Sequence, residues 1–411
     1  MAPPVSLPTS PIPLDAGAVV RRLRELDERS GGRRVAWTDV WRDERDRFDA
    51  VARELIPQIR IRTDHFANRW YVLEGQTAET VLLGSHTDCV PDGGWLDGVL
   101  GVHAGLAVLA AVGGAGIPPR RTVVLVDWAD EEGVRFGRSL LGSSAACGTL
   151  APEAFAGLSD ADGTPAAEVV AAYGFESQHL GERLPALDRV SAALELHIEQ
   201  GPVLETKGRV VAAVAGCLGV TRGRYVVRGR AGHAGATPMD LRADPVRAAA
   251  EAIAALSAVA ERGGGLATVG HLTAHPGIAT AVAGECTFTL DVRHRDPSQL
   301  SELSAAAEAE IGRAATAHDC EVEHAALLSI APVDFDPALV TRAIRATDGG
   351  AALRSGPLHD SAALAGAGIP TAMVFAPSTC GVSHTRGEDT PEDALLQAIE
   401  SFGALAIDLV S

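Results

Sequence analysis

Four short polar segments of the chain carry residue types that bind divalent metal ions and move protons. In chain order they contribute His86, Asp97, Glu131, Glu132, His197 and His384. Imidazole nitrogens and carboxylate oxygens are the usual ligands of zinc and related ions. Each segment follows a run of apolar residues, which is the pattern of a buried strand that ends at the surface of a sheet. Because open α/β sheets bind ligands at the carboxyl ends of their strands, the four segments predict one shared metal site.

The number of these groups suits two divalent ions that share a ligand. Asp97 is the candidate for the shared ligand. Two ions about 3.5–4 Å apart polarise a carbonyl group and lower the pKa of a water molecule between them. Of the neighbouring Glu131 and Glu132, one can bind metal while the other takes a proton from water and passes it to a leaving nitrogen.

Each segment taken alone also has an ordinary explanation. A His at the end of a strand is commonly a hydrogen-bonded core or loop residue. A Glu-Glu pair is commonly part of a solvated turn, and a Gly-rich loop such as Gly93–Gly98 is commonly only a turn. The four segments together, each after a buried run, favour the metal site over these explanations.

The composition of the chain argues against nucleic acids and membranes as partners. The 411 residues carry a formal net charge of −18, which argues against a nucleic-acid partner. Apolar stretches are interrupted well short of a membrane span. The six cysteines form no CxxC pair, which indicates free thiols in a reducing compartment. We therefore expect a soluble, cytoplasmic protein with a small-molecule substrate and no membrane partner.

The N-terminal sequence MAPPVSLPTSPIPLD lacks the charged and apolar regions of a signal peptide. We expect a loose Pro-rich arm there.

The elements that must position the polar segments are strands and helices of an α/β fold. Arg121–Trp128 is a continuous β-branched run, typical of a strand covered on both faces. Similar buried strands are expected at Thr80–Leu83, Ala192–His197 and Thr371–Phe375, and a strand pair at Ile59–Arg62 and Trp70–Leu73. Helical spacing predicts helices at Asp15–Glu28, Trp37–Leu55, Val99–Val112 and Asp393–Leu409. The fold class is therefore an α/β/α domain with a mixed sheet.

The pattern changes between about Thr221 and Pro332. Strand-like and helical segments follow one another there in the order β-α-β-β-α-β, which describes a ferredoxin-like α+β unit. We expect residues 221–332 to be a domain inserted into a discontinuous catalytic domain made of residues 1–220 and 333–411.

The motifs HTD, GGWLDG, DEEG, HIEQG, GHAGATPM and SHTRGE, in this order, resemble the M20 metallopeptidase family. The resemblance runs from about Leu23 to the C-terminus. Two features make it closer to the amidase/carbamoylase branch, which comprises N-carbamoyl-L-amino-acid hydrolases, allantoate amidohydrolases and β-ureidopropionases. One is His197, where many peptidase relatives have an Asp. The other is the segment DEEGVRFGRSLLGSSAACG at Asp130–Gly148.

The resemblance implies a pair of divalent metal ions in each subunit. One ion would be held by His86 and His197. The other would be held by Glu132 and His384, and Asp97 would bridge the two. Zinc is the favoured ion, while manganese, cobalt and nickel suit the same ligands.

The resemblance also assigns the proton chemistry. Glu131 would be the general base, and Asp88 would orient His86 as a metal ligand.

Further residues would act on the substrate. Gln200 would face the ureido or amide group. Arg293 resembles the Arg that holds the substrate carboxylate, a task suited to a planar bidentate donor. His233 resembles the His that reaches into the site of a partner subunit and stabilises the oxyanion, so a homodimer is expected with the inserted domain as lid and interface. Without the resemblance, His233 would be an ordinary turn residue and Arg293 a surface charge.

The chain departs from the branch at positions near the substrate. The segment PGIATAVAG at Pro276–Gly284 has Gly277 and Thr280 where the branch usually has asparagines. A hydroxyl cannot span the same gap or offer two donors as an amide does. Gly232 also replaces the usual Asn before His233.

A further departure lies near the C-terminus. In SGPLHDSA, at Ser355–Ala362, Pro357 and Leu358 replace small residues, while His359 and Asp360 remain. We expect Gly277, Thr280, Leu358 and His359 to contribute to substrate binding and to shift its specificity.

The sequence thus predicts a metal-dependent amidohydrolase that cleaves a non-peptide C–N bond of a small amino-acid-derived substrate. An N-carbamoyl-L-amino acid is the leading candidate. Allantoate is the alternative substrate, and an aminoacylase or peptidase activity is a weaker one. A non-catalytic binding protein on the same fold is the alternative from a different class, and the presence of Glu131 and all five ligand positions counts against it.

Overall fold

The structure is a computed structural model that describes residues 13–411. The expected Pro-rich arm falls almost entirely on residues 1–12, outside the described residues. The chain divides into two compact units. The first runs up to Gly216 and resumes at Asp334–Ser411, and the second is Cys217–Val333.

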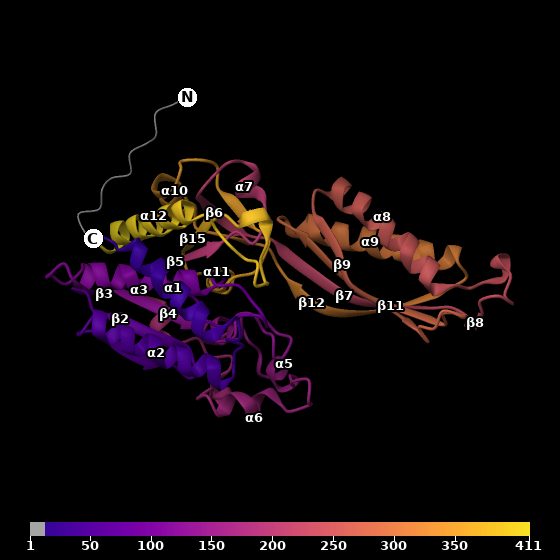
Figure 1. The fold of residues 1–411 in the computed structure, drawn as a ribbon, viewed down its shortest axis with the longest axis horizontal. Helices are drawn as coiled ribbons and strands as arrows, with labels where there is room; N and C mark the ends of the chain where they lie inside the picture. The colour runs from indigo at the N-terminus through magenta and orange to yellow at the C-terminus, as the bar shows by residue number, and fades with distance from the viewer. Residues whose placement is uncertain (1–12) are drawn as a thin grey trace. The chain divides into compact units, whose positions relative to one another are not determined.

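A nine-stranded mixed sheet forms the centre of the first unit (Figure 1). Its strands are β1 (Arg60–Thr63), β2 (Arg69–Leu73), β3 (Thr77–His86), β4 (Arg121–Trp128), β5 (Val190–Ile198), β6 (Ala212–Cys217), β13 (Val333–Asp334), β14 (Leu353–Ser355) and β15 (Thr371–Ala376). They lie in the order β1-β2-β4-β3-β5-β15-β6-β13, with β14 beside β6. The expected pair of β1 and β2 is antiparallel.

Four neighbouring strands at the middle of this sheet run parallel, namely β4, β3, β5 and β15. Each of the polar segments follows or ends one of these strands, as the sequence predicts. Because the strands are parallel, their carboxyl ends lie at one edge of the sheet, and the polar segments meet there.

The helices of the first unit cover both faces of the sheet. They are α1 (Ala16–Ser30), α2 (Asp39–Leu55), α3 (Val99–Gly113), α4 (Leu141–Ala146), α5 (Pro152–Ala156), α6 (Ala166–Ala171), α7 (Val203–Thr206), α10 (Pro337–Ala346), α11 (Asp360–Gly366) and α12 (Glu392–Val410). Helices α1, α3 and α12 share one hydrophobic core, and α4 and α11 belong to another. Strand β4 alternates between the two cores, with Val123 and Leu125 in the first and Val124 and Val126 in the second. This alternation explains its continuous β-branched run.

The helix expected at Trp37–Leu55 begins two residues later than predicted. Trp37 has a φ of 63°, a left-handed conformation outside the helix. The hydroxyl of Thr38 accepts a hydrogen bond from the backbone N–H of Trp41 and caps α2. Capping of this kind satisfies a backbone donor at the start of a helix.

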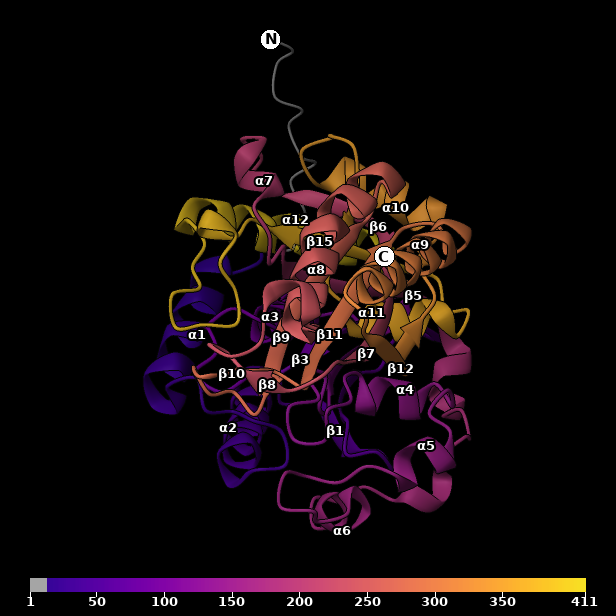
Figure 2. The same cartoon turned by 90° about the vertical axis from the view of Figure 1, so that its right-hand side faces the viewer.

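The second unit has a separate four-stranded antiparallel sheet in the order β12-β7-β11-β9. Its elements are β7 (Gly219–Arg228), β8 (Gly232–His233), α8 (Pro245–Gly263), β9 (Leu266–His275), β10 (Ala281–Val282), β11 (Glu285–His294), α9 (Pro297–Ala317) and β12 (Glu321–Ile330). Helices α8 and α9 lie side by side on one face of this sheet (Figure 2). Apart from the short pair of β8 and β10, the order of elements is the β-α-β-β-α-β order expected from the sequence.

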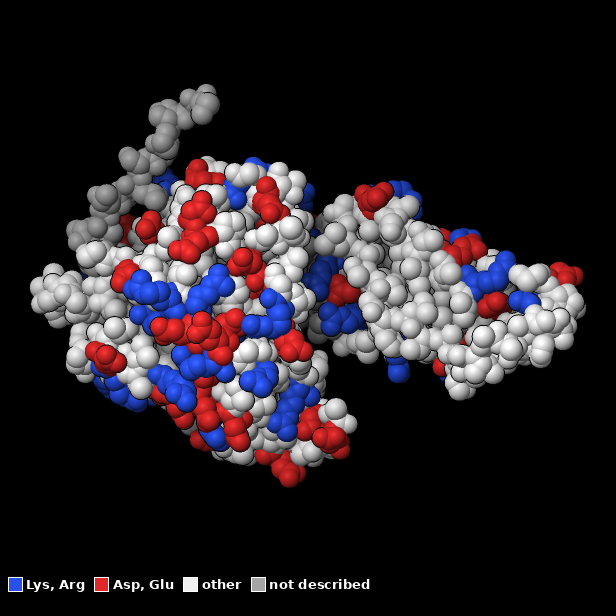
Figure 3. Space-filling model, in the orientation of Figure 1, with Lys and Arg blue, Asp and Glu red and all other residues white. Residues whose placement is uncertain are grey.

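Charged side chains of both signs are interleaved on the face of the first unit shown in Figure 3. The ion pairs of the first unit include Arg29 with Glu44 and Arg69 with Asp49. No helix among residues 13–411 is long and apolar enough to cross a membrane.

Candidate metal centre

The structure of the first unit brings the candidate ligands into two groups that share Asp97. In the first group, Asp97 Oδ1 lies 3.1 Å from Nε2 of His197 and 3.7 Å from Nε2 of His86. In the second, Asp97 Oδ2 lies 3.2 Å from Nε2 of His384, which is 3.7 Å from Oε2 of Glu132. The two oxygens of one carboxylate thus face two separate sets of potential ligands.

The strand ends and one glycine position these side chains. His86 is the last residue of β3, and His197 is the next-to-last residue of β5. Gly98 follows Asp97 with a φ of 68°, and a Cβ atom there would lie 2.4–2.6 Å from three atoms of the His86 ring. Only glycine therefore allows the loop to pass so close to His86.

These residues fit two divalent cations. Zinc bonds of about 2.0–2.2 Å in a tetrahedral arrangement separate neighbouring ligand atoms by roughly 3.3–3.6 Å. The four distances within the two groups, 3.1–3.7 Å, lie around this spacing. In addition, Oε1 of Glu132 is buried and has no hydrogen-bond partner among the described residues. Buried polar atoms are rarely left without a partner, so this oxygen is available to an ion.

Glu131 lies beside the first group without being part of it. Its Oε2 is 3.6 Å from Nε2 of His86. Burial, and then the charge of the neighbouring Glu132, raises the pKa of Glu131 well above its ordinary value. A carboxylate with a raised pKa, held next to a metal centre, is suited to accept and return a proton.

Asp88 contacts both His86 and the backbone of the two glutamates. Its Oδ1 accepts a hydrogen bond from the backbone N–H of Glu131, and its Oδ2 accepts one from that of Glu132. These bonds are 3.2 and 3.1 Å long. Nδ1 of His86 instead lies 3.1 Å from the backbone oxygen of Asp88 and 3.6 Å from its carboxylate. The positioning of the Glu131–Glu132 turn by Asp88 was not expected from the sequence.

Gln200 reaches the shared ligand itself. Its Nε2 donates a hydrogen bond of 2.8 Å to Oδ2 of Asp97 and lies 3.0 Å from Nε2 of His384. Its backbone has a φ of 58°, and its N–H donates to the Ser378 hydroxyl. Gln200 therefore lies at the second ligand group, where it can contact a bound substrate or an ion ligand.

Sequence reasoning missed Glu388, which holds the Asp97 loop. Its Oε1 accepts hydrogen bonds of 3.0 Å from the backbone N–H groups of Leu96 and Asp97, and its Oε2 accepts one from the Ser383 hydroxyl. Glu388 is almost completely buried. Its place at the end of the motif SHTRGE was a signal, but the sequence does not reveal that this carboxylate is buried.

Glu195 was also missed, because it lies inside the apolar run of β5. Its two carboxylate oxygens accept hydrogen bonds from the Ser85 hydroxyl and from the backbone N–H of Ser361, each 3.0 Å long. His359, expected to bind substrate, is likewise buried. Its ring centroid is 4.4 Å from that of His197, and its Nε2 lies 2.8 Å from the Ser355 hydroxyl.

The remaining substrate-side candidates lie at several places. Leu358 is partly buried in the first unit. His233 and Thr280 are neighbours in the second unit, where β8 pairs with β10 and the backbone oxygen of Thr280 accepts a hydrogen bond from Ala234. Gly277 has a φ of 70°, which favours glycine at this position.

Arg293 lies on β11 and is engaged with a carboxylate. Its Nε donates a hydrogen bond of 2.7 Å to Oδ1 of Asp291. The same carboxylate accepts hydrogen bonds from Arg222. An anionic ligand of Arg293 would have to share the guanidinium with Asp291.

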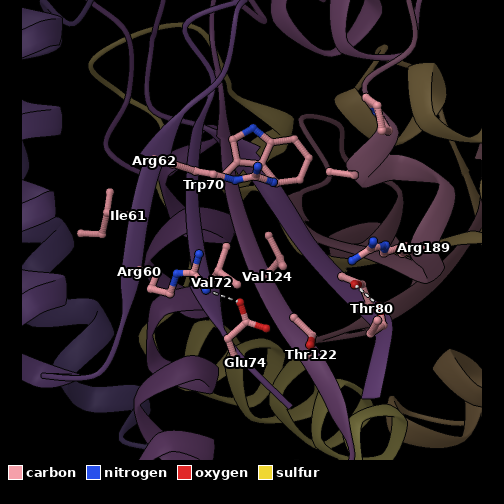
Figure 4. A pocket seen from close by; sticks show the side chains of 13 residues that line it. Arg60, Ile61, Arg62, Trp70, Val72, Glu74, Thr80, Thr122, Val124 and Arg189 are labelled. Carbon is pink, nitrogen blue, oxygen red and sulfur yellow. Dashed lines mark hydrogen bonds and ion pairs between the residues drawn. The ribbon is translucent and has the colours of Figure 1, made fainter. Parts of the chain in front are cut away.

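A cavity of about 480 Å³ lies elsewhere in the first unit, against β1, β2, β3 and β4 (Figure 4). Arg60, Arg62 and Arg189 line it together with Trp70, and Arg60 is paired with Glu74. Its lining includes none of the candidate metal ligands. The cavity is therefore separate from the metal centre.

Comparison with known proteins gives concordant results. The sequence model of peptidase family M20/M25/M40 matches residues 82–408. The chain is 36% identical to an N-carbamoyl-L-amino acid amidohydrolase of Geobacillus stearothermophilus over 78% of this chain and 80% of that protein. It is 29% identical to the allantoate amidohydrolase of Escherichia coli K12 over 93% of this chain and 94% of that protein. The crystal structure of an amidase of the hydantoinase/carbamoylase family from Burkholderia multivorans has a TM-score of 0.87 and 28% identity, and the match covers 98% of this chain and 99% of that one.

Proposed function

The chain belongs to peptidase family M20/M25/M40, and we propose that it is a metal-dependent amidohydrolase that cleaves a non-peptide C–N bond of a small amino-acid-derived substrate. The observation that carries this proposal is the pair of ligand groups that share Asp97 beside the carboxylate of Glu131. The relatives named above as amidohydrolases support the same reaction class.

The favoured substrate is an N-carbamoyl-L-amino acid. The relative with the highest identity of those described above is named for this substrate, and the match covers 80% of its length. Allantoate is the alternative, supported by the relative of that name with its 94% coverage. Both substrates present a ureido group next to a carboxylate, so both suit the same reaction. An aminoacylase or peptidase activity has weaker support.

We assign one ion to His86 and His197 and a second to Glu132 and His384, with Asp97 shared between them. Bound there, the ions would supply a Lewis acid for the carbonyl group and lower the pKa of a water molecule. Zinc is the favoured ion because imidazole and carboxylate suit it. Manganese, cobalt and nickel remain alternatives, since these ligands discriminate weakly among them.

Glu131 is the proposed general base. It would accept a proton from the attacking water on a carboxylate oxygen and deliver that proton to the leaving nitrogen as the C–N bond breaks. Burial excludes competing water from this carboxylate, and its raised pKa lets it hold the proton between the two steps.

The second unit is the proposed ferredoxin-like lid and dimer interface. Its sheet has two ten-residue edge strands, β9 and β12, and long edge strands are ready to pair with another chain. Within a homodimer, the exposed His233 would stabilise the oxyanion at the partner subunit's site. Mixing inactive Glu131→Gln and His233→Ala subunits should then restore part of the activity, since one hybrid site would be intact. An absence of recovery after proven subunit exchange would refute the shared site.

Selectivity is proposed to depend on residues beside the reacting group. Arg293 would hold the substrate carboxylate, and Gln200 would face its ureido group. Gly277 and Thr280 occupy the positions of the usual amides, and a hydroxyl offers fewer donors than an amide. Leu358 and His359 would complete the list of substrate-side residues. We also propose a cytoplasmic location, because five of the cysteines, Cys89, Cys147, Cys286, Cys320 and Cys380, are free thiols.

The experiment is a substrate screen with metal-reconstituted enzyme. N-carbamoyl amino acids, allantoate, ureidoglycolate and N-acyl amino acids would be compared by ammonia and amine release. We expect turnover of a ureido substrate, and we expect Glu131→Gln to lose it while the metal content is kept. If Glu131→Gln kept the turnover of the best substrate, the assignment of the base would be wrong. If no compound were hydrolysed but one bound, a non-catalytic binding protein would replace the proposal.

A further inference from the structure

A second group of side chains of metal-binding types lies on the surface of the first unit and shares no residue with the metal centre. Oε2 of Glu176 is 3.3 Å from Nδ1 of His65 and 3.3 Å from Nε2 of His179. The ligand atoms of the three residues all lie within 4.8 Å of one another. The side chains of His65, Glu176 and His179 are 47%, 46% and 34% exposed, so an ion can reach them from solvent.

The backbone fixes the three residues in this arrangement. The N–H of Glu176 donates a hydrogen bond of 2.6 Å to the backbone oxygen of His65. The next residue on one side, Phe66, forms a β-bridge with Phe175, and both of these rings are buried with centroids 5.4 Å apart. The surface cluster is thus anchored to the hydrophobic core of the unit.

A single helical turn places His179 on the same side as Glu176. Residues Ser177–His179 form a single 3₁₀ turn that Glu176 caps, and the N–H of His179 donates to the backbone oxygen of Glu176. Residues three apart in a 3₁₀ turn lie on the same side of it. Because they are three residues apart, the side chains of Glu176 and His179 lie on the same side of the turn.

The distances suit a metal ion better than they suit hydrogen bonds. A charge-assisted N–H···O bond is about 2.7–2.9 Å long, whereas ligand atoms around a tetrahedral zinc ion are roughly 3.3–3.6 Å apart. The two N···O distances of 3.3 Å lie in the second range. The two imidazole rings are stacked, with centroids 4.0 Å apart and an angle of 29° between their planes. Both present a nitrogen to the same oxygen, Oε2 of Glu176.

A second carboxylate completes the pattern. Oε2 of Glu182 lies 3.6 Å from Nδ1 of His179, the nitrogen that does not face Glu176. Histidines that bind metal commonly present their other ring nitrogen to a carboxylate, which orients the ring and increases its basicity.

We propose that His65, Glu176 and His179 form a surface site for a divalent transition-metal ion of the zinc class, distinct from the metal centre. One ion there would connect the turn before β2 to the segment that follows α6. Imidazole with one carboxylate selects zinc, copper or nickel over magnesium or calcium. An ion that binds only the folded chain raises its stability, so the site would strengthen this connection.

The test counts zinc ions per chain on the untagged, full-length enzyme at a buffered micromolar concentration of free zinc. The wild-type protein should hold one ion more than each of the variants His65→Ala, His179→Ala and Glu176→Gln. The control is His318→Ala. His318 also lies next to a carboxylate, 2.9 Å from Glu251, but that carboxylate already forms an ion pair with Arg313 and is therefore not expected to bind a metal ion. The control should keep the wild-type number of ions.

A second readout separates this site from the metal centre. Titration with Cu²⁺ followed by electron paramagnetic resonance should show a histidine-nitrogen signal that each of the three variants loses, with the affinity reduced at least tenfold. The turnover of the best substrate should stay within twofold of wild type. The proposal is overturned if the number of bound ions and the copper signal are the same in wild type and in all three variants, or if the His318 variant loses an ion as they do.

Discussion

The role of Asp88 in holding the Glu131–Glu132 turn gives the sharpest prediction. The substitution Asp88→Asn keeps the size of the side chain but replaces one carboxylate oxygen by an NH₂ group. One of the two backbone N–H groups that now donate to Asp88, at 3.2 and 3.1 Å, would then face a donor instead of an acceptor. The side chain of Asp88 is fully buried, so water cannot replace the lost partner.

The magnitude follows from the cost of a buried donor without an acceptor, which is about 1–3 kcal/mol. Relief of that cost requires the turn to move, and the turn carries both the proposed base and a proposed metal ligand. Since about 1.4 kcal/mol corresponds to a factor of ten, we expect kcat/KM to fall about 10- to 100-fold. The affinity for the second ion should fall in the same direction, because Glu132 moves with the turn.

The assay compares kcat/KM on the best substrate of the screen with metal content and with the thermal unfolding temperature. Asp92→Asn is the matched control, because Asp92 is exposed, lies on the same loop and has a left-handed φ of 54° that Asn tolerates. The control should behave as wild type. Wild-type activity and metal content in folded Asp88→Asn would refute the argument that these two hydrogen bonds position the catalytic groups.

Two further predictions concern the packing around the centre and the core of the first unit. Gly98→Ala should remove metal binding and activity, because the added Cβ would overlap the His86 ring. The control is Gly116→Ala, which has a similar positive φ but no atom within 4 Å of the added Cβ, and it should leave metal binding and activity unchanged. Equal metal content in the two variants would contradict this prediction. Burial, and then the nearby Arg22, lowers the pKa of His103 to about 3, so between pH 6.5 and pH 3 the unfolded chain binds a proton here that the folded chain does not. The free energy of unfolding should therefore decrease as the pH is lowered, by about 2 kcal/mol from pH 7 to pH 5 for this group. In urea denaturation of the metal-free proteins, the free energy of unfolding of His103→Leu should depend less on pH than that of wild type. The same pH dependence in both proteins would contradict the prediction.

The sequence predicts well where the candidate metal ligands lie, because the local pattern and the fold act together. His86, Glu132 and His197 each end or follow a strand-like apolar run, and parallel pairing then carries all of them to one edge of the sheet. His384 follows β15 in the same way, although seven residues of loop separate it from the strand. These assignments need only the knowledge that the strands are parallel neighbours.

The supporting residues could not be predicted, for a physical reason. Glu388 and Glu195 act through burial and through hydrogen bonds to residues more than a hundred positions away in the chain. No local pattern records such long-range partners. Asp88 shows the same limit: its contact with His86 was expected, but the hydrogen bonds that its carboxylate accepts from the Glu131–Glu132 turn, more than forty residues away, were not.

The negative charge of the carboxylates at the metal centre couples metal binding to the stability of the first unit. Five carboxylates lie in or directly against the ligand groups, namely Asp88, Asp97, Glu131, Glu132 and Glu388. The imidazoles of His86, His197 and His384 lie within 4.0 Å of these oxygens. Burial lowers the pKa of His86, whereas the hydrogen bond to Asp97 outweighs burial at His197 and His384 and raises their pKa values. Burial raises the pKa of Glu132 well above its ordinary value, as expected for a carboxylate that lacks a full counter-charge. Two divalent ions would bring four positive charges to these five carboxylates. The hydrogen bonds that Asp88 and Glu388 accept from the backbone therefore hold in place a site whose charge bound cations can balance in place of protons, so occupancy of the centre and stability of the first unit should rise together.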